Sequence, residues 1–169
     1  MIKQCFWIAL LSLVVVLGGC GIYSFSGASI DPGATTVNVK AFVNKAPYVN
    51  PTLAQTLTDG LRQKVTGQGG LAQVNSDQAD YIFESTITDY STSTVAVQNI
   101  EQPATARLTV SVKVVFTSNA NPKNNFTQTF SRSEDFAANK SLQQVQGALV
   151  EEINKQLIDD IFNRAFVNW

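Results

Sequence analysis

The residues with the chemistry of a general acid or base lie in adjacent carboxylate pairs on the last predicted helix. Glu151 is followed by Glu152, and Asp159 is followed by Asp160. Neighbouring positions of a helix point about 100° apart, so the two carboxylates of a pair diverge instead of converging on one substrate. The chain also contains no histidine, the residue that most often activates a serine nucleophile. We therefore predict no catalytic residues.

Metal and cofactor sites are not predicted either. Glu134 and Asp135 are adjacent carboxylates, but they lack the further oxygen ligands along a loop that calcium requires. Two cysteines without histidine do not make a zinc site. The glycine-rich run at 67–70 follows a helical pattern and has no Lys-Ser or Lys-Thr beside it, which indicates the end of a helix and not a phosphate loop. We expect no metal and no cofactor beyond a covalent lipid.

That lipid is predicted on Cys20. An apolar run from Phe6 to Leu17 ends in two glycines immediately before Cys20. The layout is typical of a secretory signal, and the run is too short for a spanning helix, which needs roughly 20 apolar residues. The end of the run resembles a bacterial lipobox, in which the cysteine sulfur takes a lipid before cleavage. We predict a signal peptide over 1–19, lipidation of Cys20 and one mature domain over 20–169.

Lipidation of Cys20 also predicts where the protein resides. Each buried methylene adds about 0.8 kcal/mol to membrane binding, so several acyl chains anchor a protein stably. Cys5 leaves with the signal peptide, and Cys20 then has no disulfide partner. No acidic retention signal follows Cys20. We expect the domain to be held on the periplasmic side of the outer membrane.

Composition favours a single folded domain. The chain has 169 residues, of which 44% are hydrophobic and 15% are charged, which is too apolar for disorder and too short for several domains. Its formal net charge of −1 lacks the cationic excess that binding to nucleic-acid phosphates requires. Nucleic acid is therefore not an expected partner.

Four stretches alternate apolar and polar residues, as half-buried strands do. They cover residues 36–43, 80–98, 107–116 and 126–132, and the second is long enough to be one strand or two strands joined at a bulge. A short piece at 71–74 leads into the second stretch. The third has the clearest alternation, which predicts one dry face and one wet face. Its apolar positions are Leu108, Val110, Val112, Val114 and Phe116.

Two stretches repeat apolar residues at helical spacing. The first follows Asn50, a predicted N-cap, and stops at the glycines of 67–70. The second begins at Ser141, which has the capping-box spacing to Gln144, and ends near Phe166. The predicted buried stripes are Leu53, Leu57, Leu61 and Val65, and then Leu142, Val145, Leu149, Ile153, Leu157 and Ile161. Short links between the elements predict an α+β fold: a mainly antiparallel four-stranded sheet with two helices packed on one face.

Together these features resemble the LPS-assembly lipoprotein family (LptE-like), over almost the whole mature chain. The segments that carry the resemblance are Cys20–Phe25, Ala79–Ile82, Thr86–Tyr90, Arg107–Val110 and Ile161–Trp169. The resemblance implies two helices against a four-stranded sheet, a place inside the lumen of a large outer-membrane β-barrel, and a role in delivering lipopolysaccharide to the cell surface. The barrel is then an obligate partner.

The wet face of the third predicted strand supplies the candidate contacts. The resemblance implies a basic lipopolysaccharide-binding residue near the turn between the middle strands, but the corresponding stretch here, 94–99, contains no cation. Arg107 and Lys113 share the wet face and are our candidates for meeting lipid A phosphates or the barrel, with Thr109 and Ser111 between them. A polar face of this kind suits a hydrophilic barrel lumen. An ordinary solvated face is the alternative interpretation.

We therefore expect an outer-membrane lipoprotein that acts as a non-catalytic assembly factor or plug of the lipopolysaccharide-exporting β-barrel. Lipopolysaccharide itself is a second candidate ligand. The alternative is a free-standing periplasmic lipoprotein that binds a lipid or a peptide. A hydrolase would need a nucleophile or an acid–base pair that the sequence does not offer.

Overall fold

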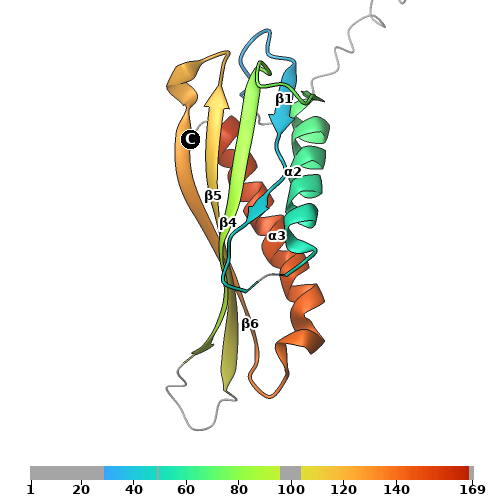
Figure 1. The fold of residues 1–169 in the computed structure, drawn as a ribbon, viewed down its shortest axis with the longest axis vertical. Helices are drawn as coiled ribbons and strands as arrows, with labels where there is room; N and C mark the ends of the chain where they lie inside the picture. Colours follow the sequence, from blue (N-terminus) through green and yellow to red (C-terminus); the bar gives the residue numbers. More distant parts are fainter. Residues whose placement is uncertain (1–28, 49, 96–103, 168–169) are drawn as a thin grey trace, which may run out of the picture.

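The computed structural model describes residues 29–48, 50–95 and 104–167, so the predicted signal peptide and Cys20 lie outside the described residues. A layer of strands packs against a layer of two helices (Figure 1). The elements in chain order are β1 (Thr36–Val39), β2 (Val43–Asn44), α2 (Leu53–Gly69), β3 (Ala72–Gln73), β4 (Tyr81–Val95), β5 (Thr105–Ser118), the 3₁₀ turn η1 (Pro122–Asn124), β6 (Phe126–Ala137) and α3 (Leu142–Phe166).

The described strands form one mixed sheet of six strands. Its order is β3-β1-β4-β5-β6, and β2 also pairs with β4. The β4–β5 and β5–β6 pairs are antiparallel, whereas β1 runs parallel to β3 and β4, and β2 runs parallel to β4. The prediction of a mainly antiparallel four-stranded sheet is therefore wrong in two respects: the sheet has six strands, and it combines parallel with antiparallel pairs. The two predicted helices do cover one face. The reason is the crossover through α2, because a helical connection returns the chain to the sheet in the same direction.

The strand predicted over 36–43 is interrupted after Val39. Phe42 turns into the core, where its backbone N–H donates to the Thr58 hydroxyl at 3.0 Å. Val43 then begins β2 with 51% of its surface exposed, although the alternating pattern predicts that it is buried. The strand prediction holds for β1 and is wrong beyond it.

β4 is a single long strand with an irregularity. Its pairing with β5 shifts register between Ile87 and Asp89. A bulge of this kind changes which alternate positions face the core. It allows both Ile87 and Tyr90 to be buried on the same side, three positions apart. Of the two predicted alternatives, one strand with a bulge is confirmed over the described part of 80–98.

The predicted dry face of β5 is confirmed. Leu108, Val110, Val112 and Val114 are fully buried, and Phe116 is 1% exposed. The antiparallel register of β5 with β6 runs without a shift from Thr105 opposite Ala137 to Phe116 opposite Phe126. β6 is therefore longer than the predicted 126–132.

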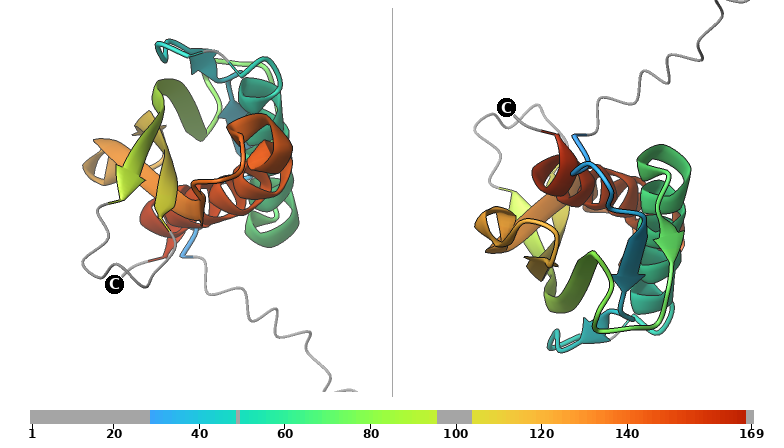
Figure 2. Two further views of the ribbon diagram at one scale, coloured as in Figure 1. Left: turned by 90° about the horizontal axis from the view of Figure 1, so that it is seen from below. Right: turned by 90° about the horizontal axis from the view of Figure 1, so that it is seen from above.

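The two helices lie on the same side of the sheet and run in the same direction (Figures 1 and 2). α2 buries its predicted stripe completely and ends at Gly69, followed by the C-cap residue Gly70, whose φ of 65° is left-handed. Its N-cap is Thr52, not Asn50 as predicted. The Asn50 side chain instead accepts hydrogen bonds from the backbone N and the hydroxyl of Thr52, both at 3.1 Å.

α3 begins as predicted, with Ser141 as N-cap and the Gln144 side chain accepting from the Ser141 backbone N at 3.0 Å. Its first turns are only half-buried, and full burial starts at Val150. At the other end, the Phe166 carbonyl accepts a hydrogen bond from the backbone N of Ser29, which joins the start of the described chain to the end of α3.

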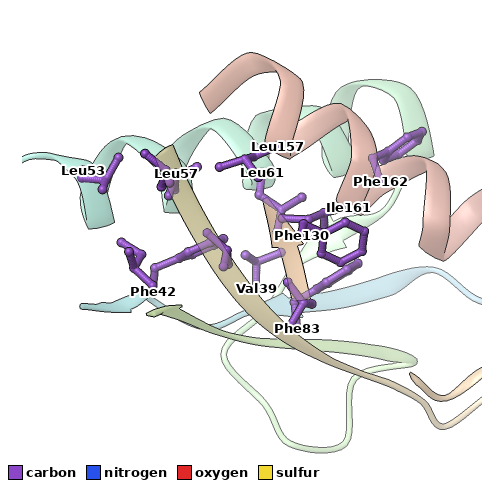
Figure 3. Close-up of a cluster of buried hydrophobic side chains, with 14 of the residues drawn as sticks. Val39, Phe42, Leu53, Leu57, Leu61, Phe83, Phe130, Leu157, Ile161 and Phe162 are labelled. Carbon is purple, nitrogen blue, oxygen red and sulfur yellow. The ribbon is translucent and has the colours of Figure 1, made fainter. Parts of the chain in front are cut away.

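The core lies between the helices and the sheet. In Figure 3, side chains from α2 and α3 point toward Val39, Phe42, Phe83 and Phe130 of the sheet side. Near the end of α3, the Phe166 ring meets the rings of Tyr81 and Phe116 edge-on, at centroid distances of 5.2 and 5.8 Å. This aromatic cluster fixes α3 to the centre of the sheet.

Candidate functional site

The face of the sheet that points away from the helices is the candidate site. The predicted contact residues Arg107, Thr109, Ser111 and Lys113 alternate with the buried residues of β5, so all four lie on this face. The structure thus brings them together on one strand. Their role as contacts stays a prediction.

Hydrogen bonds between side chains connect β5 to β6 across this polar face. Arg107 donates to both carboxylate oxygens of Asp135, at 2.6 and 2.9 Å. The hydroxyls of Thr109 and Ser133 lie 2.9 Å apart, and Ser111 donates to Ser131 at 3.0 Å. The pattern follows from the antiparallel register, which places each of these pairs directly opposite.

The two cations of the polar face differ in their surroundings. The hydrogen bonds and charge of Arg107 hold the pKa of Asp135 below its usual range, and Asp135 in turn raises the pKa of Arg107. Lys113 lies opposite Thr129 and is exposed, and the described residues provide it with no carboxylate partner within ion-pair distance. An incoming phosphate would therefore meet an uncompensated charge at Lys113 and an already compensated one at Arg107.

β4 extends the polar face with hydroxyls and acids. Ser91 donates to the Asp89 carboxylate at 2.9 Å, and Thr88 donates to the Ser111 carbonyl at 3.2 Å. Glu84, further along β4, forms an ion pair with Lys40 at 2.7 Å. The face therefore offers many hydrogen-bonding groups without a strong excess of either charge, which suits a broad hydrated contact and does not form an acid–base site.

One of the two carboxylate pairs of α3, Asp159 and Asp160, forms ion pairs with other elements. Asp159 binds Lys64 of α2 at 2.8 Å, and Asp160 binds Arg132 of β6 at 2.6 Å. The two neighbours thus point to different elements, as the helical spacing predicts. Among the described residues, no group of three or more acidic, cysteine or histidine side chains is placed to hold a metal ion. In the same residues, no helix combines the length and the apolar character that crossing a membrane requires.

A groove between α2 and α3 is a feature that the sequence reasoning missed. Its volume is about 940 Å³. Asn154 lines it, is 3% exposed, and has no hydrogen-bond partner at either side-chain polar atom among the described residues. The sequence does contain one sign of this groove: Asn154 is a polar residue inside the apolar stripe of α3, between the buried Ile153 and Leu157.

The sequence as a whole matches a family model. The LptE model, described as lipopolysaccharide-assembly, matches residues 34–165, which extend from the turn before β1 to the last turn of α3. The chain belongs to the LptE family. The family resemblance inferred from sequence is thereby confirmed, and it places the chain among lipoproteins of lipopolysaccharide assembly. No curated protein sequence matches the chain.

Solved structures share the fold of this LptE family chain at low sequence identity. A minor lipoprotein from Acinetobacter baumannii is 12% identical, with a TM-score of 0.52, over 78% of this chain and 90% of that one. The rare lipoprotein B from Shewanella oneidensis is 14% identical, with a TM-score of 0.51, over 75% and 91% of the two chains. A putative neuraminyllactose-binding hemagglutinin homolog from Helicobacter pylori is 7% identical, with a TM-score of 0.54, over 78% and 82%. These proteins differ in description, so their likeness concerns the fold alone.

Proposed function

We propose that this LptE family chain is an outer-membrane lipoprotein that serves as a non-catalytic assembly factor and plug of the lipopolysaccharide-exporting β-barrel. The observation that carries the proposal is the polar face of the sheet. On β5 and β6 its side chains are joined by hydrogen bonds between hydroxyls and by the Arg107–Asp135 pair. Barrel lumens are polar and hydrated, and a rigid hydroxyl-rich face can exchange hydrogen bonds with such a wall.

The proposal includes a lipid on Cys20. The tether would confine the domain to the membrane surface and raise its effective concentration near the barrel without any additional contact. The family match supports a lipoprotein, and the apolar run before Cys20 supports export. The domain would then work from the periplasmic side.

Within the plug, we propose Arg107, Thr109, Ser111 and Lys113 as contacts to the barrel or to lipopolysaccharide. Lys113 is the group we expect to meet a lipid A phosphate most strongly, because the described residues leave its charge uncompensated. Thr109 and Ser111 are half-buried by the strands themselves and can still accept hydrogen bonds from a partner.

The test is affinity purification of the acylated chain from outer membranes, with the Cys20→Ala variant as control. We expect a stoichiometric β-barrel, identified by mass spectrometry, to remain bound to the acylated chain through stringent washing. We also expect depletion of the chain to lower both the amount of assembled barrel and the lipopolysaccharide at the surface. A monomer that carries extractable lipid or peptide, with normal barrel levels after depletion, would support the free-standing lipoprotein instead.

A further inference from the structure

The groove between α2 and α3 faces away from the sheet and has binding capacity that the fold does not use. It is lined along both helices by Thr56, Gly60, Gln63, Gly147, Val150 and Asn154, among others. The groove is open beside Gly67 and Gly147, because no atom outside the adjacent helix backbone lies within 4 Å of the position that a Cβ would take there. A volume of about 940 Å³ is of the size that accommodates a ligand or a short peptide segment.

Asn154 is the feature of the groove that points to a ligand. Its carboxamide is nearly inaccessible, yet neither its oxygen nor its nitrogen has a hydrogen-bond partner among the described residues. Buried polar groups in folded proteins almost always have partners, and leaving one unpaired costs stability. Neighbouring Ile153 and Leu157 are fully buried, so the surroundings favour an apolar side chain at this position.

The lining chemistry distinguishes between classes of ligand. A carboxamide presents one acceptor and one donor group, which matches the N–H and C=O of a peptide group. An acyl chain would leave the amide unpaired. The charges of the lining are Lys64, Lys155, Glu151 and Asp159, two of each sign, and Lys64 is already paired with Asp159 at 2.8 Å. The groove therefore has no cationic excess for a phosphate group.

We propose that the groove between α2 and α3 binds an extended, uncharged polypeptide segment of the barrel partner, with the Asn154 carboxamide pairing one of its peptide groups. The inference rests on the proposed function for the identity of the partner, and it assigns a contact on the opposite side of the molecule from the polar sheet face. It implies that the partner contacts both layers of the fold.

Two variants test the groove without weakening the fold. Asn154→Leu replaces an unpaired amide by an apolar side chain of similar size, and Gly147→Leu fills the open groove while replacing glycine by a strong helix former. Asn163→Leu is the matched control, because Asn163 lies on the same helix outside the groove lining. Each full-length acylated variant is purified from outer membranes, and the copurified barrel and the thermal midpoint are measured.

We expect both groove variants to have a thermal midpoint equal to or above that of the wild type, and to copurify about tenfold less barrel than the wild type. Asn163→Leu should copurify as much barrel as the wild type. Full retention by both groove variants would overturn the inference and leave the proposed function intact. If the wild type itself copurifies no barrel, the proposed function fails separately.

A photo-cross-linking amino acid at Gln63, which lines the groove, then identifies the occupant in intact membranes. Cross-links to a barrel polypeptide that disappear in the Asn154→Leu background support the inference. Cross-links to lipid alone, to a second copy of this chain, or to nothing overturn it.

Discussion

Asp80 and Thr36 hold the start of β4 against the start of β1. The Asp80 carboxylate accepts from the Thr36 hydroxyl at 2.7 Å and from the Thr36 backbone N at 2.9 Å, and the Asp80 backbone N donates back to the Thr36 hydroxyl at 3.0 Å. The same carboxylate oxygen accepts from the backbone N of Thr35 at 2.9 Å. These donors, the Thr36 hydroxyl foremost, lower the pKa of Asp80.

Asp80→Asn is therefore expected to lower the free energy of unfolding at pH 7 by about 1–2 kcal/mol, because hydrogen bonds to a charged acceptor are lost. A lowered folded-state pKa gives stability that is complete above the unfolded value of about 3.9 and disappears as the pH falls through the folded value. Urea unfolding between pH 2 and pH 7 should thus show a weaker acid dependence in Asp80→Asn. Asp59→Asn, at an exposed position of α2, should keep the wild-type profile.

The polar face predicts an unequal effect of its two cations on lipopolysaccharide. Lys113→Gln is expected to reduce the lipopolysaccharide that copurifies at low salt more than Arg107→Gln does, because Asp135 already compensates Arg107. Both variants should keep an unfolding free energy close to that of the wild type, since exposed ion pairs contribute little to stability. Lys123→Gln in the η1 turn is the control. Equal lipopolysaccharide in Lys113→Gln and wild type would argue against this contact.

Gly60 sets how closely the helices approach. A Cβ built at Gly60 would overlap Cδ1 of Ile158. We expect Gly60→Leu to destabilise the fold by about 1–3 kcal/mol through overpacking, measured by urea unfolding. Ile158→Ala should recover part of this loss in the double variant, a coupling that a double-mutant cycle measures. Simple additivity of the two substitutions would show that the two side chains do not compete for space.

Phe166 anchors the end of α3 through its aromatic contacts. Phe166→Ala is expected to cost about 3–5 kcal/mol, because it leaves a cavity beside Tyr81, Phe83 and Phe116. Calorimetry or urea unfolding measures the loss. Asn163→Ala, one turn earlier and without a ring contact, should remain within about 1 kcal/mol of wild type.

The elements that sequence predicted well are those in which local pattern and burial agree. β5 alternates polar and fully buried residues from Arg107 to Val114, and α2 repeats leucine at every fourth position from Leu53 to Leu61, so each pattern has one structural solution. The capping of α3 by Ser141 and Gln144 is equally local. These features depend on neighbours in the chain, which a single sequence displays.

The parallel part of the sheet was not predicted because it depends on distant residues. β2 and β3 are two residues long, too short for any periodicity, and they exist because they pair with β4 and β1. The crossover through α2 was nonetheless a usable signal, since strands joined by a helix run parallel.

The candidate site likewise has features that the sequence predicts and features that depend on distant residues. Alternation on β5 was sufficient to place Arg107, Thr109, Ser111 and Lys113 on one face, but the partner of Arg107 follows from the β5–β6 register, which the sequence does not specify. The groove is less accessible still to sequence reasoning. It requires knowing that α2 and α3 run side by side and that Gly60 meets Ile158.

Several segments that carry the family resemblance hold the scaffold together. Asp80 and Tyr81 join the start of β4 to β1 and to Asp31, whose carboxylate accepts from the Tyr81 hydroxyl at 3.0 Å. Phe162 and Phe166 pack in the core. These parts of the resembling segments therefore contribute to the fold itself.

The hydrogen bond between Ser29 and Phe166 joins the beginning of the described chain to the end of α3, at one end of an elongated molecule. The last residues of β4 and the first residues of β5 lie at the opposite end (Figure 1). Only nine positions separate Cys20 from Ser29. A fully extended segment of that length spans at most roughly 30 Å. If the Cys20 sulfur is acylated, Ser29 must stay within that distance of the lipid, which limits how far the domain can move from the bilayer surface.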